Sequence, residues 1–124
     1  MSNALSLRDD VEFVEADATV DTTKLAEAAK DAFLLSMDGR VSESLQGLLN
    51  AHGIALRLQL RDLLGKVFDG NADLLRRAND TIAKVNADLK KAKADIDKVA
   101  DTVEQLGSLV SQLDVLLKIL GVVL

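Results

Sequence analysis

Apolar residues recur every three or four positions from Asn71 to Leu120 without interruption. One column of this pattern is Leu75, Ile82, Leu89, Ile96, Val103, Val110 and Leu117, and the other is Ala78, Val85, Ala92, Val99, Leu106, Leu113 and Leu120. A seven-residue repeat held over this length puts the apolar residues on one narrow seam of an α-helix and favours a left-handed coiled coil with another helix. The pattern therefore predicts one long C-terminal helix over about 71–120 that needs a partner.

We expect the partner helix to contact the leucine, isoleucine and valine residues of both columns. The predicted interface residues are Leu75, Ile82, Val85, Leu89, Ile96, Val99, Val103, Leu106, Val110, Leu113, Leu117 and Leu120. From Leu109 onward the helix becomes apolar nearly all round, which calls for burial by several neighbours or by lipid. Gly107 lies at this change and is a candidate for a kink, because glycine weakens a helix interior.

Two shorter helices are predicted before the long one. The first covers about 22–37, and Asp21 or Thr22 is its predicted cap. The second covers about 41–69, and Ser42 is its predicted cap. Gly53 is a candidate for a bend or a division of the second helix. Phe68 to Asn71 is predicted to be a tight turn, in which Gly70 ends one helix and Asn71 caps the next. So short a turn predicts that the flanking helices are antiparallel neighbours.

Residues 1–21 form an acidic N-terminal arm, set apart from a helical bundle over 22–124. The arm holds six acidic residues against Arg8, a net charge of −5, whereas the eight acidic and eight basic residues of 71–120 cancel. Its apolar residues follow neither a helical nor a strand period. Two interpretations remain open: a mobile arm that packs Phe13 against the bundle, and a docking segment for a basic partner.

Composition limits the class of protein. The chain has no proline, 48% hydrophobic residues and three phenylalanines as its only aromatics, which favours an all-α fold, a helical hairpin or bundle with one long C-terminal coiled-coil helix. It has no cysteine, so disulfides and thiolate metal sites are excluded. We expect a cytoplasmic protein, since neither a signal peptide nor an ordinary transmembrane segment is evident. An acidic chain without a basic stripe is also a poor candidate for binding nucleic acid.

Candidate chemistry is sparse. Asp69, Asn71, Asp73 and Asp80 have the spacing of an EF-hand calcium loop, but Leu74 stands where that loop needs glycine and Asp80 replaces its glutamate. His52 is the only histidine and has no nearby nucleophile or orienting acid in the sequence. We therefore predict no enzymatic activity, no metal and no cofactor.

Hydrophobic association remains as the expected function. We expect a structural or scaffolding module that associates with itself, as a dimer or trimer, through the heptad seam. The plain alternative for the seam is the core of the chain's own helical hairpin. Two further alternatives are a protein that binds membranes or lipid surfaces through Leu106 to Leu124, and a small helical chaperone or immunity-type protein that binds a different helical chain.

Overall fold

Four α-helices and one short 3-10 helix make up residues 19–121, the part of the chain that the computed structural model describes. These elements are α2 (Thr22–Ser36), α3 (Glu43–Leu63), α4 (Ala72–Ala94), η1 (Ile96–Lys98) and α5 (Val99–Ile119). No strand occurs within residues 19–121, and the predicted all-α class is confirmed there. Residues 1–18 of the predicted acidic arm lie outside the described residues.

The first two helices begin at the caps that the sequence predicts. The carboxylate of Asp21 accepts a hydrogen bond from the amide of Lys24 at 3.1 Å, and the hydroxyl of Ser42 accepts one from the amide of Leu45 at 3.3 Å. Each bond satisfies an amide that has no partner within the helix. Asn71 precedes α4 as predicted, but its side-chain amide donates to the carbonyl of Asp69 and does not cap the helix.

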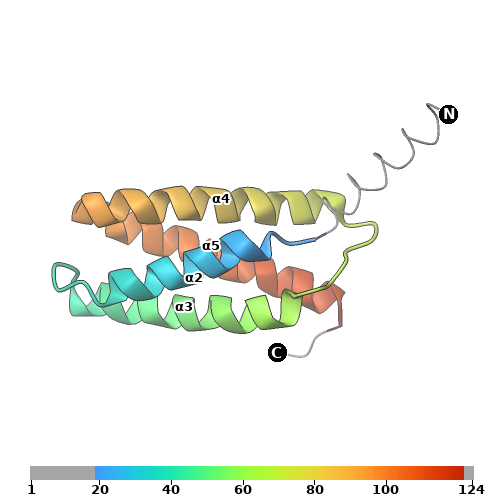
Figure 1. Ribbon diagram of the computed structural model, residues 1–124, viewed down its shortest axis with the longest axis horizontal. Helices are drawn as coiled ribbons and strands as arrows, with labels where there is room; N and C mark the ends of the chain where they lie inside the picture. Colours follow the sequence, from blue (N-terminus) through green and yellow to red (C-terminus); the bar gives the residue numbers. More distant parts are fainter. Residues whose placement is uncertain (1–18, 122–124) are drawn as a thin grey trace.

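The α-helices are arranged as two antiparallel hairpins, α2 with α3 and α4 with α5 (Figure 1). The hairpins pack so that α2 lies along α4 and α3 lies along α5, which gives a four-helix bundle. No Cα atom of α3 comes within 8 Å of α4, so these two helices lie diagonally across the bundle. The prediction that the turn at 68–71 makes its flanking helices neighbours is therefore wrong.

The connection between α3 and α4 crosses one end of the bundle. The helix predicted over 41–69 ends at Leu63, and the connection contains Gly65 and Gly70 with φ angles of +74° and +77°. Glycine adopts this left-handed backbone without the steric cost that a β-carbon brings. Phe68 is 2% exposed and packs into the end of the core. The connection is thus long enough to reach the start of α4, which lies diagonally across the bundle from α3, and the buried Phe68 anchors it.

The helix predicted over 71–120 is divided at Asp95. This residue has an extended backbone with φ −134° and ψ 101°, and η1 then turns the chain into α5, which runs back along α4 (Figure 1). A single helix of this length would leave its apolar seam in water, whereas the reversal buries the seam inside one molecule. Gly107, the predicted position of a kink, does not end the helix, because α5 runs through it.

Gly53 does not interrupt α3 either. A β-carbon at this position would lie 3.2 Å from Cζ of Phe33 on α2, which is tighter than an ordinary van der Waals contact. Glycine therefore allows the Phe33 ring to lie directly on the backbone of α3, so that α2 and α3 approach closely.

Candidate interaction surface

The predicted seam lies inside the bundle. Val103 is 6% exposed and eight further seam residues are 1% exposed or less: Leu75, Ile82, Val85, Leu89, Val99, Leu106, Leu113 and Leu117. The remaining three, Ile96, Val110 and Leu120, are partly buried and pack against the same core. In this state of the molecule, the predicted interface residues are covered by the chain's own helices.

Polar contacts fix how α2 lies along α4. The ammonium group of Lys93 lies 2.7 Å from the carboxylate of Asp31, whose residue is only 7% exposed. The side-chain amide of Asn86 donates to the carbonyl of Lys24 at 3.0 Å. Near the start of α2, the side chain of Asn79 accepts from the amide of Asp21 at 2.8 Å. These bonds hold one relative position of the two helices, because a shift along the axis would leave buried polar groups unpaired.

The contact between α3 and α5 is held by one glutamine and one histidine. The side-chain amide of Gln59 donates to the carbonyl of Val110 at 2.9 Å and to the carboxylate of Asp114 at 2.7 Å. The ring of His52 lies against Gly107, where a β-carbon would be 3.6 Å from Nε2. Burial lowers the pKa of His52 below its usual 6.5, since desolvation disfavours the charged imidazolium. His52 is a packing residue at this contact, and it makes no hydrogen bond within residues 19–121.

A continuous apolar face runs along the outside of α3. We call it the α3 outer face, and it consists of Gly47, Leu48, Ala51, Ile54, Ala55 and Leu58. Its large members are substantially exposed, Leu48 by 44%, Ile54 by 47% and Leu58 by 50%. Leu48, Ala51, Ala55 and Leu58 follow a spacing of three, four and three residues, which places them on one stripe of the helix. The helix therefore has two apolar sides, of which only one faces the core.

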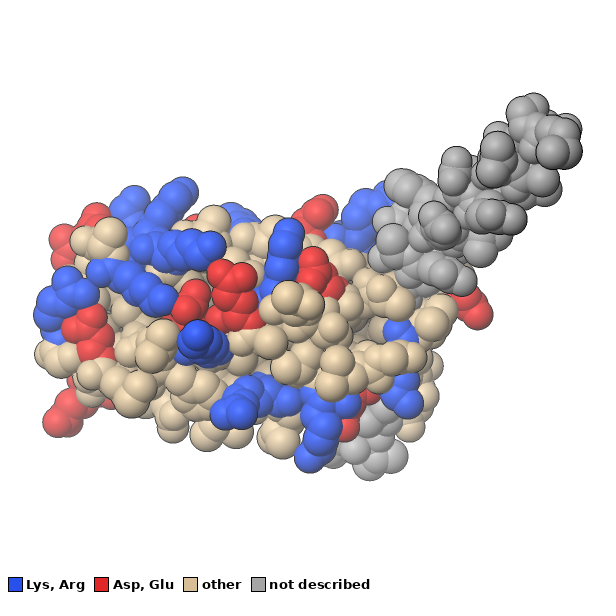
Figure 2. Space-filling model, viewed as in Figure 1, with Lys and Arg blue, Asp and Glu red and all other residues tan. Residues whose placement is uncertain are grey.

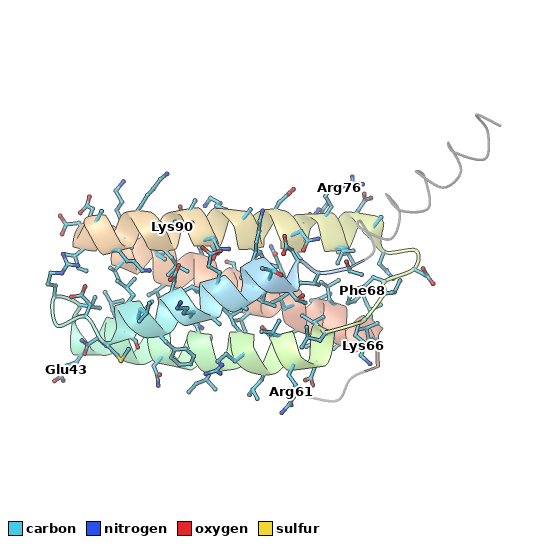
Figure 3. All side chains as sticks on the ribbon, in the orientation of Figure 1. Glu43, Arg61, Lys66, Phe68, Arg76 and Lys90 are labelled. Carbon is cyan, nitrogen blue, oxygen red and sulfur yellow. The ribbon has the colours of Figure 1, made fainter. Side chains whose placement is uncertain are left out.

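Opposite charges mark the two ends of the α3 outer face. Glu43 projects from the first turn of α3 and Arg61 from the last turn, toward the same side of the molecule (Figure 3). Between these ends α3 also carries the exposed Arg57, and Figure 2 shows that basic side chains with acidic ones among them gather along α4. The α3 outer face is thus an apolar strip with Glu43 near one end and Arg61, which contacts Asp62 at 3.3 Å, near the other.

A shallow groove between α2 and α3 adjoins this strip. It has a volume of about 400 Å³ and is lined by Phe33, the basic residues Lys30 and Arg57, and apolar neighbours. The guanidinium carbon of Arg57 lies 5.7 Å from the centre of the Phe33 ring, within the range of a cation–π contact. Phe33 fills the space above Gly53, so its ring forms part of the floor of the groove.

The acidic residues with calcium-loop spacing do not come together in the structure. No cluster of three or more metal-ligating side chains occurs within residues 19–121, and Asp69, Asp73 and Asp80 form no such cluster. The groove between α4 and α5 is lined by Lys84, Lys91 and Lys98 together with acidic residues, so it carries charges of both signs.

The apolar C-terminal end of the chain contributes mainly to the core. Leu109, Leu113, Leu116 and Leu117 are all 1% exposed or less, whereas Val115 and Ile119 on the outer side of α5 are 48% and 43% exposed. Among the helices of residues 19–121, none combines the length and the apolar character needed to cross a membrane.

Sequence reasoning missed the α3 outer face. The predictions for the second helix concern its cap and Gly53 and single out none of the exposed Leu48, Ile54 and Leu58. The available signal is the second set of three- and four-residue spacings in α3, which a single-stripe interpretation overlooks.

Comparison of the chain with protein-family models, with curated proteins and with solved structures finds no match in any of the three.

Proposed function

We propose that this protein is a non-catalytic interaction module that associates with itself through the α3 outer face. The observation that carries the proposal is an exposed apolar strip with an acidic residue at one end and a basic residue at the other. Such a strip is complementary to a second copy of itself turned end for end.

The two-fold arrangement follows from the positions of the residues. In an antiparallel pair of α3 helices, Leu48 of one copy lies opposite Leu58 of the other, and Ala51 lies opposite Ala55. Small residues at the centre let the two helix backbones approach, and larger ones toward the ends fill the remaining space. Two-fold interfaces require this reciprocity, in which residue i meets residue j and j meets i.

The end charges select this orientation. Antiparallel packing brings Glu43 of each copy toward Arg61 of the other, where it competes with Asp62 for the guanidinium group. Parallel packing would instead place the two Glu43 carboxylates together. Exposed pairs of this kind contribute at most about 1 kcal/mol each, so they set orientation more than affinity.

Apolar burial supplies the driving force. Complete burial of a leucine or isoleucine side chain stabilises by roughly 1.5–3 kcal/mol, and about half of that remains available where the side chain is already half buried. A two-fold interface counts Leu48, Ile54 and Leu58 twice. Six such contributions offset a substantial part of the cost of association.

Ile54→Asp is the test of this surface, with Val115→Asp as its matched control. Both residues are exposed branched side chains on helices, 47% and 48% exposed, but Val115 lies on α5, away from the α3 outer face. The proposal predicts that Ile54→Asp weakens self-association at least tenfold, as measured by sedimentation equilibrium, while Val115→Asp leaves it unchanged. Equal effects of the two substitutions would contradict the proposal.

The same measurement separates the two alternative functions. A single-chain mass that does not change with concentration, together with binding to liposomes, would favour the lipid surface. A single-chain mass together with one specific co-purifying helical protein from the native host would favour the chaperone or immunity-type function. Either result would displace the self-association proposal.

A further inference from the structure

The heptad pattern continues in phase through the place where the structure reverses direction. Leu89 and Ala92 at the end of α4 are followed at the same three- and four-residue spacing by Ile96, Val99 and Val103. A connection between two separate helices has no reason to keep this phase, since each helix could place its apolar stripe independently. A continuous helix requires it.

The connection also lacks the residues that end helices. Residues 93–99 contain neither glycine nor proline, and the reversal consists of the extended Asp95 followed by η1. The other two connections contain glycine, Gly39 after α2 and both Gly65 and Gly70 after α3. Without glycine or proline, the reversal depends on the contacts that Asp95 and its neighbours make.

Two contacts hold the reversal. A guanidinium nitrogen of Arg40, in the connection between α2 and α3, donates to the backbone carbonyl of Lys93 at 3.0 Å. The carboxylate of Asp95 accepts from the amide of Asp97 at 3.2 Å. In a continuous helix the amide of Asp97 would itself donate to the carbonyl of Lys93. Arg40 and Asp95 thus occupy the two halves of one helical hydrogen bond.

We propose that the α4–α5 hairpin opens at Asp95 into one continuous helix, and that the protein then forms a dimer in which two copies exchange α5. The occupant of the seam in this state is a second copy of the same chain. This inference uses the buried seam, goes beyond the proposed association of the α3 outer face, and is independent of it.

The contacts of the bundle are preserved in the exchanged dimer. The hydroxyl of Thr102 on α5 lies 3.5 Å from the carbonyl of Asp88 on α4, so the two helices pair about a point near Asp95. A second copy related by a two-fold axis near that point supplies the same α5 surface to α4 and α3. Exchange at a hinge of this kind costs little, because every interface is remade between copies. Ile96, which is partly buried in the hairpin, would lie beside the axis.

Opening of the α4–α5 hairpin would greatly lengthen the distance between Lys84 and Glu104. Lys84 and Glu104 line the same groove between α4 and α5 and therefore lie across it from each other in the hairpin. In a continuous helix they are 20 residues apart in sequence, which corresponds to about 30 Å at about 1.5 Å per residue. The chain has no cysteine, so cysteines introduced at these two positions are unique sites for spin labels.

The experiment uses the full chain carrying Ile54→Asp, so that association through the α3 outer face does not contribute. Into it we introduce Arg40→Ala with Asp95→Ala to release the reversal, and separately Arg76→Ala as a control for loss of an exposed arginine. Protein labelled at Lys84→Cys and Glu104→Cys is diluted into excess unlabelled protein, so that only distances within one chain are recorded.

We expect Arg40→Ala with Asp95→Ala to raise the dimer fraction at least tenfold over the Arg76→Ala control, with a distance of about 30 Å in the dimer. We expect Ile96→Pro to abolish this dimer, because proline prevents a continuous helix while the extended Asp95 is the conformation favoured before proline. A dimer that retains only the short distance, or no dimer at any concentration, overturns the inference.

A wild-type measurement covers the case in which the double variant fails to fold. Wild-type and Ile96→Pro chains are refolded from urea at high protein concentration, and the dimer fractions are compared after dilution. An exchanged dimer persists because separation requires unfolding, whereas a dimer formed through the α3 outer face dissociates rapidly. Persistence in the wild type alone supports exchange, and equal behaviour of the two chains overturns it. Neither outcome changes the test of Ile54→Asp in the wild-type chain.

Discussion

Arg40 donates a hydrogen bond to the backbone carbonyl of Lys93, Nη2 to O at 3.0 Å, and so ties the turn between α2 and α3 to the end of α4. The same guanidinium is held by the carboxylate of Asp38 at 2.7 Å. One side chain therefore links the turns at one end of both hairpins, at the point where α4 stops although its sequence favours continuation.

The contact between Asp38 and Arg40 should persist at pH values below the usual pKa of an aspartate side chain. Hydrogen bonds from Arg40 lower the pKa of Asp38 from 3.8 to about 2. Because the folded pKa is the lower one, the stabilisation is fully present above about pH 3.8 and is lost as the pH falls toward 2. NMR titration of the Asp38 carboxyl should give a midpoint near 2 in the wild type and a higher midpoint in Arg40→Ala, where only the backbone amide of residue 40 still donates to the carboxylate. Identical midpoints in the two proteins would show that the contact does not form in solution.

Gly53→Val should lower the free energy of unfolding, whereas Gly47→Ala should raise it. Gly53→Val forces a side chain into the Phe33 ring, 3.2 Å from its β-carbon position, and should lower the free energy of unfolding by about 1–3 kcal/mol. Gly47→Ala meets no atom within 4 Å and should raise it by up to about 1 kcal/mol through helix propensity. Urea unfolding at low protein concentration measures both, and a stable Gly53→Val protein would refute the close packing of α2 on α3.

Lys93→Met should cost more stability than Lys90→Met. Lys93 pairs with Asp31, whose side chain is 9% exposed, so its removal leaves a nearly buried carboxylate without a partner. We expect a loss of about 2 kcal/mol or more. Lys90 pairs with Glu27 at 3.2 Å, but their side chains are 65% and 43% exposed, and the expected loss is under about 1 kcal/mol. Urea unfolding of the two variants compares them directly, and equal losses would argue against the buried pair.

His52 should make stability depend on pH near neutrality. Burial against α5 keeps its folded pKa below the usual 6.5, so the unfolded chain takes up a proton first as the pH falls. The free energy of unfolding should therefore be constant above about pH 7.5 and decline as the pH drops through 6.5. His52→Gln should remove that decline. A wild-type stability that rises on acidification through this range would contradict the assigned burial.

Some of this architecture could be predicted from the sequence because the relevant physics is local. Capping by Asp21 and Ser42 depends on one side chain and the amide three residues later, and both caps form. The seam residues follow from periodicity, and their burial follows wherever a partner helix is found. Periodicity alone does not say whether that partner is the same chain or another.

The remaining features depend on contacts that are distant in sequence. No glycine or proline marks the reversal at Asp95, and besides the local Asp95–Asp97 bond it is held by Arg40 from a different hairpin. The diagonal placement of α3 and α4 depends on Phe68 packing into the core, which its neighbours in sequence do not reveal. The α3 outer face could not be predicted from the sequence, because α3 has two apolar sides and only the packed bundle shows which of them remains exposed.

Sedimentation equilibrium of four proteins tests the central claim most directly: the wild type, Glu43→Arg, Arg61→Glu and the double variant. Circular dichroism first confirms that each is folded, since reversing charges at the ends of α3 also opposes the helix dipole. The proposed antiparallel pairing predicts a dimer for the wild type, weaker association for either single variant and recovery in the double variant, where the opposite charges meet again. A single-chain mass for the wild type at every concentration, or the same association constant in all four proteins, would contradict it.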